Sequence, residues 1–178
     1  MDRAAADPFV YRHTDGTCYF TASVPAYDRI ILRAANDLGG LVHAEEKTLW
    51  VRHESGPQSI HIWAPEIHYL FGGWYIYYAA GDKDDIWNIR PYVLHCKGQN
   101  PMKDEWEELG MMQAADSDEF SFHAFSLDAT VFEHRGEWYY IWAEKTGCRS
   151  PDFQSVYRKN GSSQQTLHGS GIVDNTGL

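Results

Sequence analysis

The sequence predicts an all-β protein built from repeated four-stranded antiparallel units, as in a β-propeller. Three observations lead to this prediction. Hairpin patterns recur about 60 residues apart, and a strand-like aromatic run follows the turn glycine of each. About four candidate strands fall in each repeat, which is the number in a propeller blade. No helical periodicity competes with this pattern. A sandwich of unrelated hairpins is the alternative that the pattern leaves open.

The hairpins are the best-marked elements. They are expected at residues 9–23, 63–81 and 129–144, with turn glycines Gly16, Gly73 and Gly136. Glycine suits these places because it adopts the positive φ that a tight turn needs, and Asp15-Gly16 is a strong hairpin signal. Further β-branched and aromatic runs complete the first two repeats with strands at 29–35, 48–52, 90–95 and 105–110.

The chain is short for a closed propeller. At about 60 residues a blade, its 178 residues hold two full blades and about half of a third, whereas propellers have about four to eight. We therefore expect a partial propeller over residues 1–154. Residues 155–178 are polar and aperiodic, and such a segment buries too little apolar surface to offset the entropy lost on ordering. We expect this tail to be disordered or irregular, and non-native.

Composition and charge exclude several classes of protein. The net charge is −10 and no Lys/Arg cluster occurs, so we expect no binding to nucleic acid. No apolar run is long enough to span a membrane, and the first residues lack a signal-peptide pattern. We therefore expect no membrane association and a cytoplasmic chain as given, or an extracellular one if a signal was removed. Cys18, Cys96 and Cys148 lack metal-like spacing and are expected as free thiols.

Three acidic residues stand where the blade patterns begin. Asp7, Glu66 and Asp128 each precede the run expected to form the innermost strand of a blade. Because these strands all start at one face of a propeller's central channel, we expect the three carboxylates to converge. Converging carboxylates suit glycoside hydrolysis, which needs an ionised base for water, a protonated acid for the leaving oxygen, and neighbours that separate their pKa values.

Four motifs at these places carry a family resemblance. They read Ala-Asp-Pro-Phe at 6–9, Tyr-Phe-Thr-Ala-Ser-Val-Pro-Ala-Tyr-Asp-Arg-Ile at 19–30, His-Ile-Trp-Ala-Pro-Glu-Ile-His at 61–68 and Phe-Ser-Leu-Asp-Ala-Thr at 125–130. Together they resemble glycoside hydrolase family 43, and within it the exo-acting α-L-arabinofuranosidases. The resemblance implies a five-bladed propeller and an inverting hydrolase of arabinose-containing oligosaccharides or polysaccharides.

The resemblance also implies roles for individual residues. Asp7 falls on the general base, and Asp128 on the residue that keeps the general acid's pKa high and orients it. Glu66 stands in the pocket wall, where many members have Asp. Trp63 and His68 fall on pocket-lining positions that hold the sugar, with aromatic packing around the channel as the alternative. We expect no cofactor and no metal, because the ligands that a later blade would supply are missing.

One departure from the family pattern concerns the general acid. In the family it is a Glu of a later blade within a Glu-Gly-Pro type motif, and this sequence has no such motif. General acid–base assistance is worth about 10²–10⁴-fold, so we expect weak or no hydrolysis by the isolated chain. The alternatives are a non-catalytic carbohydrate-binding fragment and a β-xylosidase of the same family.

The end of the chain departs from the pattern too. Plausible codons for residues 155–178, read in a shifted frame, give a continuation that resembles the family's next strand. We therefore expect a truncation or frameshift after about residue 154. Open blade edges have unpaired strands, which recruit partners, so a homo-oligomer is a further expectation.

Overall fold

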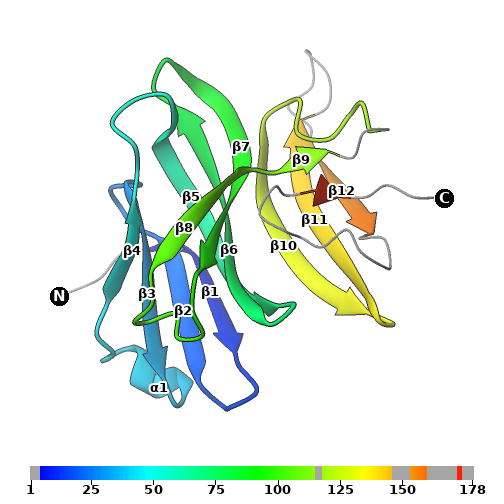
Figure 1. Cartoon of the computed structure of the whole chain (residues 1–178). Coiled ribbons are helices and arrows are strands. Elements are labelled where there is room, and N and C mark those ends of the chain that lie inside the picture. Colours follow the sequence, from blue (N-terminus) through cyan, green and yellow to red (C-terminus); the bar gives the residue numbers. More distant parts are fainter. Residues whose placement is uncertain (1–4, 115–117, 146–152, 160–171, 174–178) are drawn as a thin grey trace.

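A computed structural model describes residues 5–114, 118–145, 153–159 and 172–173, the last two segments as backbone only. Three antiparallel sheets lie side by side in it (Figure 1). Blade one contains β1 (Ala6–Arg12), β2 (Cys18–Ser23), β3 (Arg29–Ala35) and β4 (Lys47–Val51). Blade two contains β5 (Pro57–Leu70), β6 (Gly73–Asp82), β7 (Asp85–Cys96) and β8 (Trp106–Met111). Blade three contains β10 (Ser126–His134), β11 (Glu137–Lys145) and β12 (Phe153–Lys159).

Two small elements complete the described fold. The four-residue helix α1 (Leu38–Leu41) lies between β3 and β4, and β9 (Gln113–Ala114) pairs in parallel with β13 (Ile172–Val173). In each blade the spatial order of the strands follows their order along the chain, which is the blade arrangement that the hairpin repeat predicts. The predicted all-β architecture is therefore confirmed.

The hairpin turns form as expected, with one shift. Gly16 and Gly136 have φ of 91° and 80°. In the second hairpin the turn glycine is Gly72 with φ of 82°, not the predicted Gly73, which is the first residue of β6. Phe71 before it also has a positive φ, of 52°, because a two-residue hairpin turn of type I′ requires positive φ at both central residues.

The core sits between the blades. The side chains of β6 alternate, so that Trp74, Ile76 and Tyr78 pack toward blade one while Tyr75 and Tyr77 pack toward blade three. Blade two is therefore buried on both faces, as an inner blade of a propeller is. Trp74 and Trp142 are almost fully buried in these clusters, and Trp138 packs half-buried at the edge of the second cluster.

The segment expected to be irregular differs in part from that expectation. Its residues 155–159 belong to β12, which pairs along its length with β11. Without β12, the edge of β11 would have unpaired backbone N–H and C=O groups. Another strand can form backbone hydrogen bonds with such an edge even where its side chains show no strand pattern. Residues 160–171 and 174–178 of the expected tail lie outside the described residues.

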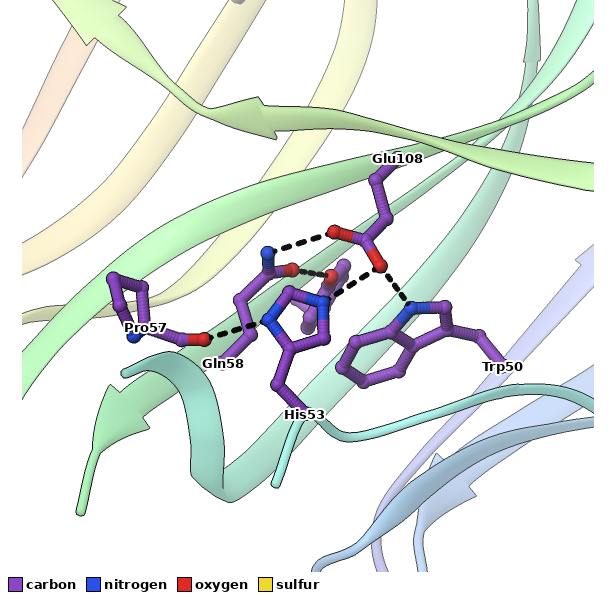
Figure 2. A network of polar contacts seen from close by, with 6 residues as sticks. Trp50, His53, Pro57, Gln58 and Glu108 are labelled. Carbon is purple, nitrogen blue, oxygen red and sulfur yellow. Dashed lines mark hydrogen bonds and ion pairs between the residues drawn. The ribbon is translucent and has the colours of Figure 1, made fainter. Parts of the chain in front are cut away.

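A polar cluster around Glu108 joins the outer strands of blades one and two (Figure 2). One carboxylate oxygen accepts hydrogen bonds from Trp50 Nε1 at 2.6 Å and His53 Nε2 at 2.9 Å, and the other accepts from Gln58 Nε2 at 3.0 Å. Burial alone would raise the pKa of Glu108, but these hydrogen bonds and the charge of His53 lower it below its ordinary value. The cluster links the two blades whose innermost strands carry Asp7 and Glu66.

Candidate active site

Each innermost strand contains a β-bulge, near the start of β1 and β10 and in the middle of β5. The bulge residues are Asp7 in β1, Ala64 in β5 and Asp128 in β10, with φ of 49°, 44° and 51°. At each of them the register with the neighbouring strand shifts, so that two residues oppose one. Non-glycine residues seldom adopt such φ values, and bulges re-aim a side chain away from the regular pleat. The same local geometry therefore occurs in the innermost strand of every blade, and β5 contains it a second time at His61.

The bulges correct the predicted equivalence of the three acidic residues. All three lie inside strands and do not precede them. Asp7 and Asp128 are structural equivalents, but in blade two this place belongs to Ala64, and Glu66 follows two residues later. The sequence hid this offset because β5 begins at Pro57, well before the expected strand, and contains three register shifts.

Two of the carboxylates nevertheless act electrostatically on the third. Strand β5 contacts both β1 and β10, which brings the bulges to a common place between the blades. The pKa of Asp128 is raised, first by partial burial and then by the negative charges of Asp7 and Glu66. Asp7 and Glu66 therefore lie close enough to Asp128 for their charges to act on it, whereas the convergence of the three residues on one sugar site and their roles in catalysis stay predictions.

A buried hydroxyl links the first two bulges. Ser23 is only 1% exposed, and its Oγ donates to Asp7 Oδ2 at 2.8 Å while accepting from the backbone N–H of Ala64 at 2.8 Å. The position of the Asp7 carboxylate therefore depends on the backbone of blade two. The sequence motif at 19–30 contains this serine, but nothing in its residue type marks it as a partner of Asp7.

A hydrogen bond with His68 holds the carboxylate of Glu66 in place. The imidazole Nε2 lies 3.1 Å from Glu66 Oε2, and His68 is 5% exposed, with its ring 5.1 Å from that of Phe9 and 6.0 Å from that of Tyr77. His68 thereby orients the carboxylate, while its predicted direct contact with a sugar stays a prediction. Trp63 is half-buried and contacts the ring of His61, with centroids 4.4 Å apart.

A fully buried carboxylate, that of Glu144, holds the segment that leads to Asp128. Glu144 is 0% exposed and accepts hydrogen bonds from the backbone N–H groups of Phe122 and Ala124, each at 3.0 Å, and from Trp142 Nε1 at 2.7 Å. It fixes the segment that leads into β10. Sequence reasoning missed Glu144 because an acidic residue at the end of a hairpin strand reads as solvated surface.

Within residues 5–114 and 118–145, no three His, Cys, Asp or Glu side chains are grouped so that they could hold a metal ion. In the same part of the chain no helix has the length and apolarity needed to cross a membrane. Cys18 and Cys96 are buried free thiols, and Cys148 lies outside the described residues.

Comparison with known proteins connects this geometry to a family. Residues 1–170 match the family model of glycosyl hydrolases family 43. The chain belongs to this family. The match takes in residues 155–170, part of the tail expected to be non-native.

The family 43 chain is similar to several arabinofuranosidases. It is 48% identical over 142 residues to "Extracellular exo-alpha-(1->5)-L-arabinofuranosidase" of Streptomyces chartreusis, covering 80% of this chain and 42% of that protein. It is 41% identical over 168 residues to "Alpha-L-arabinofuranosidase 43" of Humicola insolens, covering 94% and 34%. The crystal structure of alpha-L-arabinofuranosidase from Lactobacillus brevis matches with a TM-score of 0.78 and 38% identity, covering 96% and 51%. The chain thus spans about half the length of these relatives or less, and it is a partial five-bladed propeller.

Proposed function

We propose that this family 43 chain carries the water-activating part of an inverting α-L-arabinofuranosidase site. The observation that carries the proposal is the pairing of Asp7 and Asp128. They occupy equivalent bulges in two blades, and the charge of Asp7 helps to raise the pKa of Asp128. The similarity to proteins named as arabinofuranosidases supports arabinose as the sugar.

In this proposal Asp7 is the general base. Its side chain is exposed to solvent, and among the described residues its one hydrogen-bonding partner is Ser23, through Oδ2. The second oxygen can therefore receive a proton from a water molecule that attacks the anomeric carbon. Asp128 keeps a proton more readily than an ordinary aspartate, which suits a group that tunes and orients a neighbouring acid.

Glu66 completes the pocket in this proposal. As a carboxylate held by His68, it can accept hydrogen bonds from sugar hydroxyls. The sequence has no Glu-Gly-Pro type motif to supply the general acid, so we propose weak turnover of natural linkages by the isolated chain. An aryl leaving group of low pKa departs without protonation, which makes the base half of the site measurable on its own.

The test is hydrolysis of 2,4-dinitrophenyl α-L-arabinofuranoside by the wild-type chain, Asp7→Asn and the control Asp15→Asn. Asp15 lies in the solvent-exposed turn of the first hairpin. Loss of the base should lower the rate about 10²–10⁴-fold in Asp7→Asn, with Asp15→Asn close to wild type. Equal rates in all three proteins would refute the proposed hydrolase activity and favour the carbohydrate-binding alternative. Faster hydrolysis of the corresponding β-xyloside would reassign the substrate.

A further inference from the structure

Residues 122–124, which lie just before β10, are held by two side chains of opposite charge, and we call these residues the held segment. Glu144 of β11 accepts hydrogen bonds from the first and the last backbone N–H group of the segment. Arg90 of β7 donates from Nη2 to the backbone carbonyl of His123, between them, at 2.9 Å. The backbone of three consecutive residues therefore has polar partners on two different blades.

Arg90 joins blade two to blade three through this contact. It belongs to β7, whereas His123 leads into β10, and these two strands lie against each other (Figure 1). The buried cluster between the two blades consists of apolar and aromatic side chains, among them Tyr77, Val131 and Trp142. Apolar packing has no preferred direction, whereas a hydrogen bond does. The contact of Arg90 therefore limits how blade three can slide or turn against blade two.

The charge of Arg90 is matched by that of Glu144. Partial burial lowers the pKa of the Arg90 guanidinium and the charge of Glu144 opposes this effect, and an arginine stays protonated at neutral pH in either case. Glu144 is fully buried, and a buried charge is costly unless it is paired and hydrogen-bonded. Arg90 thus brings positive charge from blade two to a carboxylate of blade three, in addition to its hydrogen bond with the held segment.

The bulge residue Asp128 follows the held segment closely along the chain. The backbone N–H of Lys145 donates to the carbonyl of Phe125 at 3.0 Å, which ties the start of β10 to β11. The pairing of these strands is then interrupted between Leu127 and Thr130, and Asp128 lies in that interruption. Because strand pairing leaves this carboxylate some freedom, its position also depends on what holds the segment before it.

We propose that Arg90 is a positioning residue of the candidate active site, which fixes the place of Asp128 by holding the segment before β10 against blade two. The place in question is the one relative to the carboxylates of Asp7 and Glu66. This inference rests on the proposed function, in which the three carboxylates surround the terminal sugar. Arg90 acts on the site through the backbone of blade three and does not contact the sugar.

The experiment measures the pKa of Asp128 by NMR, from the pH dependence of its carboxyl ¹³C shift, in wild type, Arg90→Met and the control Arg12→Met. Arg12 is an exposed arginine at the end of β1 away from Asp7. Burial and the charges of Asp7 and Glu66 raise the pKa of Asp128 in the wild-type chain. Displacement of Asp128 in Arg90→Met weakens these effects, so the pKa should fall toward its ordinary value of 3.8. It should stay unchanged in Arg12→Met.

Arg90→Lys is a second variant that keeps the positive charge but has a shorter reach to the carbonyl of His123. A smaller fall in the pKa of Asp128 is expected, and this variant decides the question if Arg90→Met does not fold. Titration with methyl α-L-arabinofuranoside gives a second readout. Its Kd should rise about tenfold in Arg90→Met and stay within about threefold of wild type in Arg12→Met.

The outcomes separate this inference from the function on which it rests. An unchanged pKa of Asp128 in the Arg90 variants, or an equal fall in Arg12→Met, would overturn Arg90 as a positioning residue. A rise would overturn it too, because the loss of a nearby positive charge, and not a displacement, raises the pKa of an acid. If the pKa falls as expected but the wild-type chain binds no sugar, Arg90 positions Asp128 and the proposed function is wrong.

Discussion

Replacing Glu144 with Gln should destabilise the protein by about 1–3 kcal/mol. The magnitude follows from three N–H donors that share one carboxylate. Phe122 N and Trp142 Nε1 donate to one oxygen, and Ala124 N donates to the other. Gln has one amide oxygen and one NH₂ group in place of the two carboxylate oxygens. At least one of the three N–H donors would then face the NH₂ group and lose its hydrogen bond. Because Glu144 is fully buried, water cannot replace the lost acceptor without opening the segment before β10.

Urea unfolding followed by tryptophan fluorescence measures this change as a lower midpoint at an unchanged m-value. Glu133→Gln is the control, since Glu133 is an exposed acidic residue on the adjacent strand β10. Its free energy of unfolding should stay within about 0.5 kcal/mol of wild type. If Glu144→Gln unfolds at the same urea concentration as Glu133→Gln, the carboxylate does not hold the segment that leads to Asp128.

Three further perturbations test the links around the site. Ser23→Ala removes the hydrogen bond to Asp7 and should lower kcat for an aryl arabinofuranoside with little change in KM. Glu108→Gln should lower Tm at pH 7. The depressed pKa of Glu108 gives stability that is present above its unfolded value near 4.5 and is lost as pH falls through its lower folded value. Asp128→Asn should raise Tm at pH 7. The raised pKa of Asp128 disfavours folding once pH rises above the unfolded value of 3.8 and through the folded value.

Each of these predictions has an opposing result. Unchanged kcat in Ser23→Ala would show that Asp7 acts without the hydrogen bond from Ser23. A Tm difference for Glu108→Gln that persists undiminished at pH 3 would assign the effect to packing and not to the charged cluster. A lower Tm for Asp128→Asn at pH 7 would mean that the carboxylate stabilises the fold, against the sign given by its burial and by the charges of Asp7 and Glu66.

The local parts of the fold were predictable because turn chemistry is written in adjacent residues. Gly16 and Gly136 mark their hairpins directly, and the alternation of β6 follows from its aromatic run. The start of β5 was not predictable from the sequence. Gln58, His61 and Ala64 have positive φ values there, and these residue types do not indicate a bulge.

The site itself was predictable as a set of acidic residues but not as a network. Asp7 and Asp128 stand in motifs that can be read along the chain. Their supports cannot be read in this way, because Ser23 lies 16 residues from Asp7 and Glu144 holds Phe122 from 22 residues away. Strand pairing within a blade brings these residues together, and no local pattern in the sequence encodes such contacts.

The most direct test of the site is an NMR titration of the wild-type chain with methyl α-L-arabinofuranoside. We predict that the backbone amides of the three bulge residues, Asp7, Ala64 and Asp128, shift together with one shared Kd. The amide of Glu108, in the cluster between the outer strands, should not move. Shifts at the bulges with different Kd values, or shifts confined to other parts of the chain, would contradict a single sugar site built from the three blades.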